Sequence, residues 1–417
     1  MSVYGFFSYS FLLSLLVAVG IIALFSCGAV ISSGLQTVNG NIFMFDNLSF
    51  YLVLLVLMLG CFSVILLGSW LSSSTTIMLM LSLGFSGLCF CVNHSILFWC
   101  LYELSMLPLL LLIFKDSPYS ERFLAGWYFA VYLLVTSLPL LLIIIYLTFI
   151  NGSTSFMDWS TNNTNTAILV VLCLIFFTKV PLSPFHTWLP IVHAEATSIV
   201  SMFLSGYIMK LGLLGVYRCS PSLFTSEALP YLIYCCVLSV FFIVTASSEL
   251  DGKRWLAFLS LSHIVVAFIS FFIASWEEIS LSFIYCLGHG LSAGLVFSVL
   301  WLGYNIASSR NWLLVKESLG GGHMRVVMVL SLLSLCSFPP TLQFFCEVNL
   351  ITLSTDSWII LSFWCLYLFM GGLVPLTLCG HLLIRSESQE NGIYDTNGFN
   401  VLFLLLLLWC YFGIFLL

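Results

Sequence analysis

Long apolar stretches recur along most of the chain, and short polar segments separate them. Several stretches reach the roughly 20 residues that a helix needs to cross about 30 Å of hydrocarbon. They are continuous and do not alternate with a period of two, so they favour helices over a membrane β-barrel. We therefore predict an all-α, polytopic integral membrane protein with about 13 transmembrane helices. The predicted limits are 6–31, 47–69, 76–93, 95–114, 123–149, 167–189, 196–217, 229–248, 255–274, 279–306, 326–354, 357–384 and 398–416.

The composition agrees with this pattern and leaves no room for a soluble domain. The chain is 61% hydrophobic and 7% charged, whereas soluble domains carry about 25% charged residues. Turn-forming residues mark the predicted loops, as at Asn151-Gly152, Gly320 to Gly322 and Asn391-Gly392. We expect residues 1–417 to form a single membrane domain. The N-terminal apolar run is longer than a signal-peptide core and lacks the Arg- and Ser-rich character of a transit peptide, so no removable address is expected.

Positive charge in the loops gives an orientation. If the loops are assigned alternately to two sides, Arg218 alone falls on one side. The side of the N-terminus collects eight basic residues, namely Lys115, Arg122, Lys253, Arg254, Arg310, Lys316, Arg325 and Arg385. We therefore expect the N-terminus on the positive side, the cytoplasm or the matrix, and the C-terminus opposite.

The predicted spans also show a weak internal symmetry. Residues 76–217 and 229–384 each contain five spans, and residues 398–417 form a separate C-terminal helix. The fourth span of each block is interrupted by proline, at Pro181 and Pro184 in the first and at Pro339-Pro340 in the second. Because five is odd, the two blocks must have opposite orientations in the membrane. Inverted repeats with broken helices are typical of transporter cores.

Two lysines and two glutamates lie within these apolar spans, where a charge costs about 2.5–3.5 kcal/mol at the bilayer centre. Such residues face a protein interior or a water-filled cavity and are functional candidates. They are Glu103, Lys179, Lys210 and Glu347. The alternatives are a carboxyl kept neutral by burial or lying near the interface, and lysines that extend to the interface. Lysine titrates readily when it is buried and arginine does not, so lysine at both central positions suits a proton relay.

Two histidines in later spans, His263 and His289, titrate near neutrality and extend the series of candidates. The alternative for each is an ordinary hydrogen bond between helices. His186, His193 and Glu195 flank the first proline break, and we expect them to order the loop there. The six candidates Glu103, Lys179, Lys210, His263, His289 and Glu347 are interpreted as a route for protons across both blocks.

The sequence contains no motif for metal, nucleotide or nucleophilic chemistry. The 15 cysteines are scattered without a C-x-x-C pair, so neither an iron–sulfur cluster nor a zinc site is predicted. No phosphate-binding loop, nucleotide fingerprint, nucleophile elbow or haem motif occurs, and no nucleic-acid partner is expected. We predict no cofactor in this chain.

At these residues the sequence resembles the antiporter-like, proton-translocating subunits of respiratory complex I, and within that family it is most similar to the subunit 4 branch of the mitochondrial enzyme. The similarity runs from Asp46 to the end of the twelfth span. The motifs that carry it are F-D-N-L-S-F, L-Y-E, T-K-V-P-L with F-H-T-W-L-P-I-V-H-A-E-A, K-L-G-L-L-G-V-Y-R, D-G-K-R-W-L-A-F-L-S-L-S-H-I, G-H-G-L-S and F-P-P-T. Thr197 departs from the pattern, because proline usually follows H-x-E-A in the family.

The resemblance implies a role for each candidate. Glu103 and Lys179 would form a control ion pair, and Lys210 would be the central proton carrier. His263 and His289 would continue a hydrated axis toward a distal relay at Glu347. A glutamate at this last position favours the subunit 4 branch over its siblings.

The resemblance also implies surroundings for the chain. It implies the mitochondrial inner membrane, contacts with lipids and other membrane-arm subunits, including neighbouring antiporter-like subunits, and flavin and iron–sulfur clusters only in other subunits of the complex. The family has fourteen helices, and one span precedes Asp46 here where the family has two. One helix fewer would place the N-terminus on the matrix side, as the charge count does.

Two other functions remain open from the sequence. A stand-alone sodium/proton antiporter subunit would use the same residues without redox coupling. A structural membrane scaffold would contain the same buried charges only as pairs.

Overall fold

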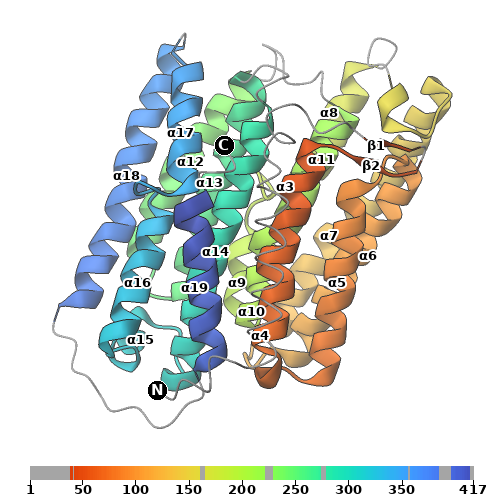
Figure 1. The fold of residues 1–417 in the computed structure, drawn as a ribbon. Coiled ribbons are helices and arrows are strands. Elements are labelled where there is room, and N and C mark those ends of the chain that lie inside the picture. Colours follow the sequence, from red (N-terminus) through yellow and green to blue (C-terminus); the bar gives the residue numbers. More distant parts are fainter. Residues whose placement is uncertain are drawn as a thin grey trace.

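The computed structural model describes residues 38–40, 42–159, 165–220, 229–273, 279–355, 357–384 and 396–413. This part of the chain is a polytopic helical membrane protein in which long helices run side by side (Figure 1). Nine of its helical segments are long and apolar enough to cross a membrane. Seven are single helices: α5 (Ser73–Cys91), α6 (Ser95–Asp116), α7 (Arg122–Asn151), α12 (Leu229–Ser248), α13 (Gly252–Ile273), α14 (Ser280–Ala307) and α18 (Trp358–Leu383).

The other two long segments each contain a stretch of π-helix, which the sequence analysis did not predict. One is α3 (Asn47–Leu55), η2 (Val56–Cys61) and α4 (Phe62–Leu66). The other is α10 (Ser198–Phe203), η6 (Leu204–Ile208) and α11 (Met209–Cys219). Single π-helical turns within α-helices are often found at functional sites. η6 ends two residues before Lys210.

Two predicted spans are divided at their prolines. Span 167–189 consists of α8 (Thr166–Lys179) and the start of α9 (Trp188–Glu195), and span 326–354 consists of α16 (Gly322–Leu335) and α17 (Leu342–Leu353). Proline removes a backbone donor and clashes with the preceding turn, so helices end at these positions. Such breaks are tolerated at membrane depth only where they lie against protein or water.

Helices coincide with the twelve predicted spans from residue 47 onward, the last being α19 (Asn397–Phe412). Span 6–31 and the loop at Asn391-Gly392 lie outside the described residues. The prediction omitted one short helix, α15 (Trp312–Ser318), and the antiparallel pair β1 (Val38–Asn39) and β2 (Met44–Phe45). Two 3₁₀ turns, η3 (Gly68–Trp70) and η4 (Phe156–Asp158), lie in loops.

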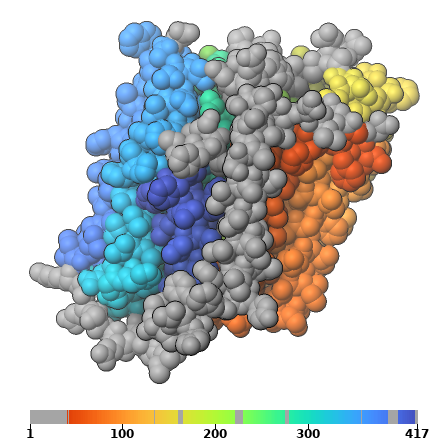
Figure 2. Space-filling model, viewed as in Figure 1, coloured from red at the N-terminus to blue at the C-terminus, as the bar shows by residue number. Residues whose placement is uncertain are grey.

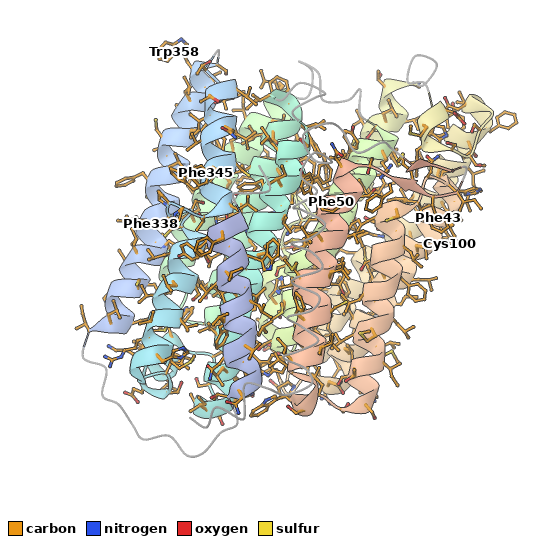
Figure 3. The ribbon with its side chains drawn as sticks, viewed as in Figure 1. Phe43, Phe50, Cys100, Phe338, Phe345 and Trp358 are labelled. Carbon is orange, nitrogen blue, oxygen red and sulfur yellow. The ribbon has the colours of Figure 1, made fainter. Side chains whose placement is uncertain are left out.

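Two segments form the centre of the bundle, and other helices face outward. Most of α14 and nearly all of the α10–η6–α11 segment are buried, whereas most of α7 is not. In the space-filling view, the blue helices α16–α19 lie toward the left and the orange helix α5 lies on the right (Figure 2). Large apolar side chains on the outside of the bundle are exposed, among them Trp358 of α18 and Phe338 in the break between α16 and α17 (Figure 3). Outward-facing apolar side chains suit a lipid environment, whereas the polar candidates need the centre.

Contacts of the basic residues place most of them at one end of the bundle. Lys115 at the end of α6 donates to Ser74 at the start of α5, and Arg310 pairs with Asp251 in the loop before α13. Arg218 lies at the other end, beside the loop that starts α3, where it pairs with Asp46. This arrangement agrees with the charge asymmetry read from the loops.

Candidate functional site

Glu103 and Lys179 form a direct ion pair between α6 and α8. Lys179 Nζ lies 2.5 Å from Glu103 Oε1, and the two side chains are 4% and 16% exposed respectively. Lys179 is the last residue of α8, so the proline break that follows fixes where its side chain enters the bundle. A pair this strongly desolvated is stable only when both partners are present. The structure thus brings together two candidates 76 residues apart.

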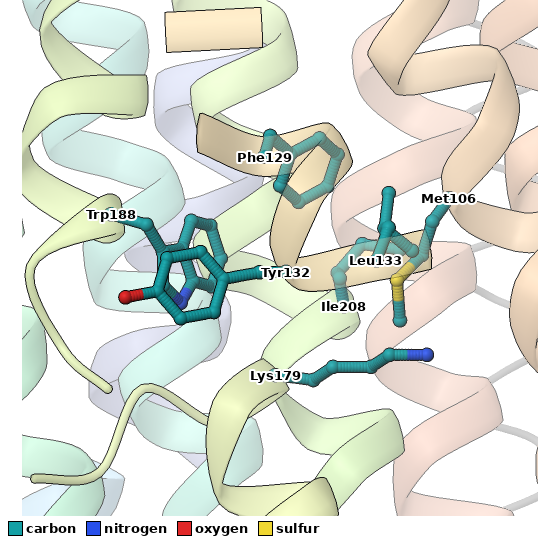
Figure 4. A pocket seen from close by; sticks show the side chains of 7 residues that line it. All are labelled: Met106, Phe129, Tyr132, Leu133, Lys179, Trp188 and Ile208. Atoms are coloured by element: carbon teal, nitrogen blue, oxygen red, sulfur yellow. The ribbon is translucent and has the colours of Figure 1, made fainter. Parts of the chain in front are cut away.

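The ammonium of Lys179 also lies on an aromatic face. Its Nζ is 3.9 Å from the centre of the Tyr102 ring, a cation–π contact with the neighbour of Glu103 in the sequence. A small apolar pocket lies beside the lysine stem, lined by Met106, Phe129, Tyr132, Leu133, Lys179, Trp188 and Ile208 (Figure 4). Ile208 belongs to η6, so this pocket lies between the ion pair and the segment that carries Lys210.

Lys210 is fully buried, and no carboxylate lies within ion-pairing distance of it among the described residues. Its Nζ donates to the backbone oxygen of Ser205 at 2.5 Å, within η6. α11, the helix of Lys210, packs against α8, the helix of Lys179. Gly212 makes this packing close, because a Cβ there would lie 2.4 Å from Val180. A fully buried amine without a counter-ion is the kind of group whose charge responds strongly to its neighbours.

The two histidines lie next to each other between α13 and α14. The ring centres of His263 and His289 are 5.0 Å apart. α14, the helix of His289, packs closely against η6, since a Cβ at Gly290 would lie 3.3 Å from the backbone oxygen of Gly206. His289 is completely buried, and neither of its ring nitrogens has a hydrogen-bond partner in the described part of the chain. His263 Nδ1 contacts three polar side chains, as described below.

Glu347 lies in α17, directly after the second proline break, and is 1% exposed. Its Oε1 accepts hydrogen bonds from Ser337 Oγ at 2.9 Å and Gln343 Nε2 at 3.4 Å. The expectation of a carboxyl near the interface does not describe this position, because the side chain is enclosed by protein. Ser337 belongs to the break itself, so the interruption of the helix supplies a donor to the carboxylate.

Polar side chains that the sequence analysis did not single out connect His263 to Glu347. They are Tyr285 of α14, Gln343 of α17 and Tyr367 of α18. Each is a single uncharged polar residue in an apolar helix, so the sequence alone did not distinguish it. The spacing of one helical turn between Gln343 and Glu347 was the one sequence feature that indicated a contact between them. His263 enters this network, and His289 does not, within the described residues.

Of the three residues expected to order the first break, Glu195 forms an ion pair at the end of the bundle where most of the basic residues lie. Arg310 pairs with Glu195 at 3.3 Å and Asp251 at 3.1 Å, and it also donates to the backbone oxygen of Ala194. Lys253, likewise buried, donates to the backbone oxygen of Ala196 at 2.7 Å. These contacts satisfy the carbonyls at the end of α9. Glu195 is thus part of a structural cluster that joins the loops after α9, before α13 and after α14.

His193 and His186 make no ion pair among the described residues, and both lie against phenylalanine rings. His193 stacks on Phe297 with ring centres 5.2 Å apart, and His186 lies 4.8 Å from Phe242.

Thr197 keeps the backbone conformation that proline would impose. Its φ is −60° and its ψ is 152°, and α10 begins at the next residue. Proline fixes φ near −65°, so threonine replaces it here without a change in the path of the chain. The departure from the family motif at this position leaves the junction of α9 and α10 intact.

No group of three or more His, Cys, Asp or Glu side chains among the described residues is placed to hold a metal ion. The polar side chains that gather in the bundle instead contact one another in pairs and networks. Five of the six candidates have an ionisable group next to another polar atom, whereas His289 has no hydrogen-bond partner among the described residues.

A family model described as NADH:quinone oxidoreductase/Mrp antiporter, TM, matches residues 92–373. Among relatives, the chain is 28% identical over 316 residues to a NADH-ubiquinone oxidoreductase chain 4 of Albinaria caerulea, covering 74% of this chain and 71% of the relative. Several further relatives with the same description match at 27–31% identity.

Solved structures of low sequence identity share the fold. A chain of respiratory complex I from Thermus thermophilus has a TM-score of 0.78 at 19% identity, covering 89% of this chain and 82% of that one. A chain of an Mrp complex from Dietzia sp. has a TM-score of 0.74 at 15% identity, covering 93% of this chain and 77% of that one. The fold is therefore the one found in both kinds of complex.

Proposed function

Because the chain belongs to the NADH:quinone oxidoreductase/Mrp antiporter transmembrane family, we propose that it is a proton-translocating membrane-arm subunit of a mitochondrial complex I. The relatives that match over most of its length are chain 4 subunits, and Glu347 agrees with that branch. Its partners would be other membrane-arm subunits, including antiporter-like neighbours, and membrane lipids. Flavin, iron–sulfur clusters and quinone chemistry would belong to other subunits.

The proposed architecture consists of two inverted repeats. The first, 76–217, contains α5, α6, α7, the broken α8/α9 and α10–α11, and the second, 229–384, contains α12, α13, α14, the broken α16/α17 and α18. Each repeat has its break in the fourth unit and an ionisable candidate beside it, Lys179 before the first and Glu347 after the second. α19 would stand outside both repeats.

In the proposed mechanism, the ion pair controls the charge that Lys210 experiences. When Glu103 neutralises Lys179, Lys210 can hold a proton. When the pair opens, an uncompensated ammonium remains on α8, which packs against α11. Two like charges about 8 Å apart at an effective dielectric of about 20 repel each other by about 2 kcal/mol. That is similar to the roughly 2.3 kcal/mol needed to move one charge against 100 mV.

A proton that leaves Lys210 would pass to the histidines and then to Glu347. The single observation that carries this proposal is the environment of Lys210. It is fully buried, it donates only to a backbone oxygen among the described partners, and η6, which precedes it, packs against α14, the helix of His289.

The test is replacement of Lys210 by alanine in the assembled complex. We expect fewer protons translocated per electron, measured with a pH-sensitive dye in vesicles while NADH is oxidised. Lys316→Ala is the matched control, because Lys316 is a lysine at the surface, where it donates to the backbone oxygen of Ile384. Unchanged pumping per electron in Lys210→Ala would contradict the central role of this residue.

An antiporter subunit of the Mrp type is the second candidate, favoured by the family description and by the shared fold. It would use the same buried residues without redox coupling. Purification from native membranes separates the two functions, since NADH oxidation should copurify with a complex I subunit. Sodium uptake driven by a pH gradient in vesicles that contain this chain would favour the antiporter.

A further inference from the structure

Three uncharged polar side chains fill the space between His263 and Glu347. Tyr285, Gln343 and Tyr367 come from α14, α17 and α18, and His263 comes from α13. Two pairs of consecutive helices, α13 with α14 and α17 with α18, thus each contribute two polar groups to the same place. Packing alone does not require polar groups here, because phenylalanine and leucine would fill the same space without the free-energy cost of burying polar atoms.

The distances make these groups a connected set. Tyr367 Oη is 2.5 Å from His263 Nδ1, Tyr285 Oη is 3.2 Å from the same nitrogen, and the two hydroxyls are 3.2 Å apart. Gln343 Nε2 contacts both Tyr285 Oη and Glu347 Oε1, and Glu347 Oε2 is buried without a hydrogen-bond partner among the described residues. The imidazole and the two hydroxyls are therefore in direct contact, and Gln343 links them to a carboxylate that has one oxygen free to accept a proton.

Gln343 holds the set together from the side of α17. Its Nε2 lies 3.2 Å from Tyr285 Oη, 3.4 Å from Glu347 Oε1 and 3.3 Å from His263 Nδ1. Ser292 Oγ lies 3.4 Å from Oε1 of the same amide, which fixes which end faces the histidine. An amide group donates from nitrogen but does not readily pass a proton on, so Gln343 is a positioning residue here.

The network lies deep inside the protein. The side chains of Tyr285, Gln343, Glu347 and Tyr367 are each at most 2% exposed, and His263 is 3% exposed. Phe363 and Trp364 pack around Tyr367 on α18. The two hydroxyls that contact His263 are therefore enclosed in the protein together with Glu347.

We propose that Tyr367 and Tyr285 form a hydroxyl relay that carries protons between His263 and Glu347. The inference rests on the proposed function, and it assigns to two tyrosines a step within it. A phenol hydroxyl both donates and accepts, which a relay requires. The protonated imidazole of His263 gives its Nδ1 proton to the oxygen of Tyr367, whose own hydroxyl proton passes to the Glu347 carboxylate.

Charge and protons balance in this step. The imidazolium becomes neutral imidazole, the carboxylate becomes a neutral carboxyl, and the tyrosine is neutral before and after. Rotation of the hydroxyl away from His263 and back toward Glu347 restores the starting orientation. Tyr285, which contacts the same nitrogen and the hydroxyl of Tyr367, provides a second course through the same contacts.

The experiment compares Tyr367→Phe, Tyr285→Phe and the double variant in the assembled complex. Phenylalanine keeps the ring and its packing and removes only the hydroxyl. We expect each single variant to lower proton translocation per electron at least twofold, and the double variant to lower it to the level of Lys210→Ala. Tyr411→Phe is the matched control, because the hydroxyl of Tyr411 donates to the backbone oxygen of Leu330, away from the network.

The outcomes separate the relay from the proposed function. If both single variants pump like the wild type while Lys210→Ala does not, the relay is wrong and the proposed function stands. If Lys210→Ala also pumps normally, the proposed function fails. Native gel electrophoresis reports assembly, and where the double variant does not assemble, the two single variants decide.

Discussion

At the scale of the residue, the main feature of this protein is the presence of ionisable side chains buried inside the bundle. Lys179 has a carboxylate partner and an aromatic face, whereas Lys210 has a backbone oxygen in a π-helical turn. Two lysines of the same type thus occupy environments that stabilise the charged form to different degrees. The proposed mechanism requires this difference, because Lys179 acts in the controlling ion pair and Lys210 carries the proton.

Replacement of the ion pair tests whether Glu103 and Lys179 act beyond stability. Glu103→Gln alone leaves a buried ammonium without its partner, and breaking such a pair typically costs about 3–5 kcal/mol. We expect reduced assembly in this variant, measured by native gel electrophoresis. The double variant Glu103→Gln with Lys179→Gln removes both charges, and we expect assembly to recover while proton pumping stays impaired.

Full pumping in the double variant would contradict the control role of the pair. It would instead favour a scaffold in which the two charges only stabilise each other. Lys316→Gln, which changes a surface lysine, serves as the control for the loss of one positive charge.

At the scale of the element, close packing around α14 holds the candidates in register. Leu59 of η2 is fully buried, and its side chain lies against Gly206 of η6 and Gly294 of α14. A Cβ added at Gly294 would lie 2.1 Å from Leu59 Cδ1. Only glycine permits η2 to approach both segments, one of which carries Lys210 and the other His289.

Gly294→Ala should therefore overpack the centre of the bundle. Inserting a methyl group into a well-packed core costs about 1–3 kcal/mol. We expect a lower midpoint of thermal unfolding of the purified complex. Shortening the partner in the double variant Gly294→Ala with Leu59→Ala should recover part of the loss beyond additivity.

Gly372→Ala on α18 is the matched control. A Cβ at Gly372 would meet no atom within 4 Å, and alanine stabilises a helix interior by up to about 1 kcal/mol relative to glycine. Equal effects of the two substitutions would show that the close approach at Gly294 is unimportant.

At the scale of the whole molecule, the two ends of the bundle have different chemistry. At one end, Arg310 and Lys253 link neighbouring loops by an ion pair and a hydrogen bond. At the other end, Arg218 pairs with Asp46. Cytoplasmic or matrix loops carry the excess of lysine and arginine in membrane proteins. We therefore expect the end with Arg310 and Lys253 to face the cytoplasm or the matrix.

Cysteine labelling of intact membranes tests this orientation. Ser73, the first residue of α5, and Thr154, in the loop after α7, are exposed and lie at opposite ends of the bundle. We expect a membrane-impermeant maleimide to label Ser73→Cys from the cytoplasmic or matrix side and Thr154→Cys from the opposite side. The unmodified chain gives the background of its native cysteines, and labelling of both positions from one side would contradict the orientation.

The sequence by itself determined the fold class, the helices from residue 47 onward, the position of both breaks and the six ionisable candidates. These follow from local physics, because apolar length, proline and buried charge each act within one stretch of chain. The tertiary structure alone decided that Glu103 meets Lys179, that His263 contacts the Glu347 network, and that Tyr285, Gln343 and Tyr367 join them. Those contacts depend on which faces of separate helices meet, and packing across the bundle sets this, whereas the periodicity of a single helix does not.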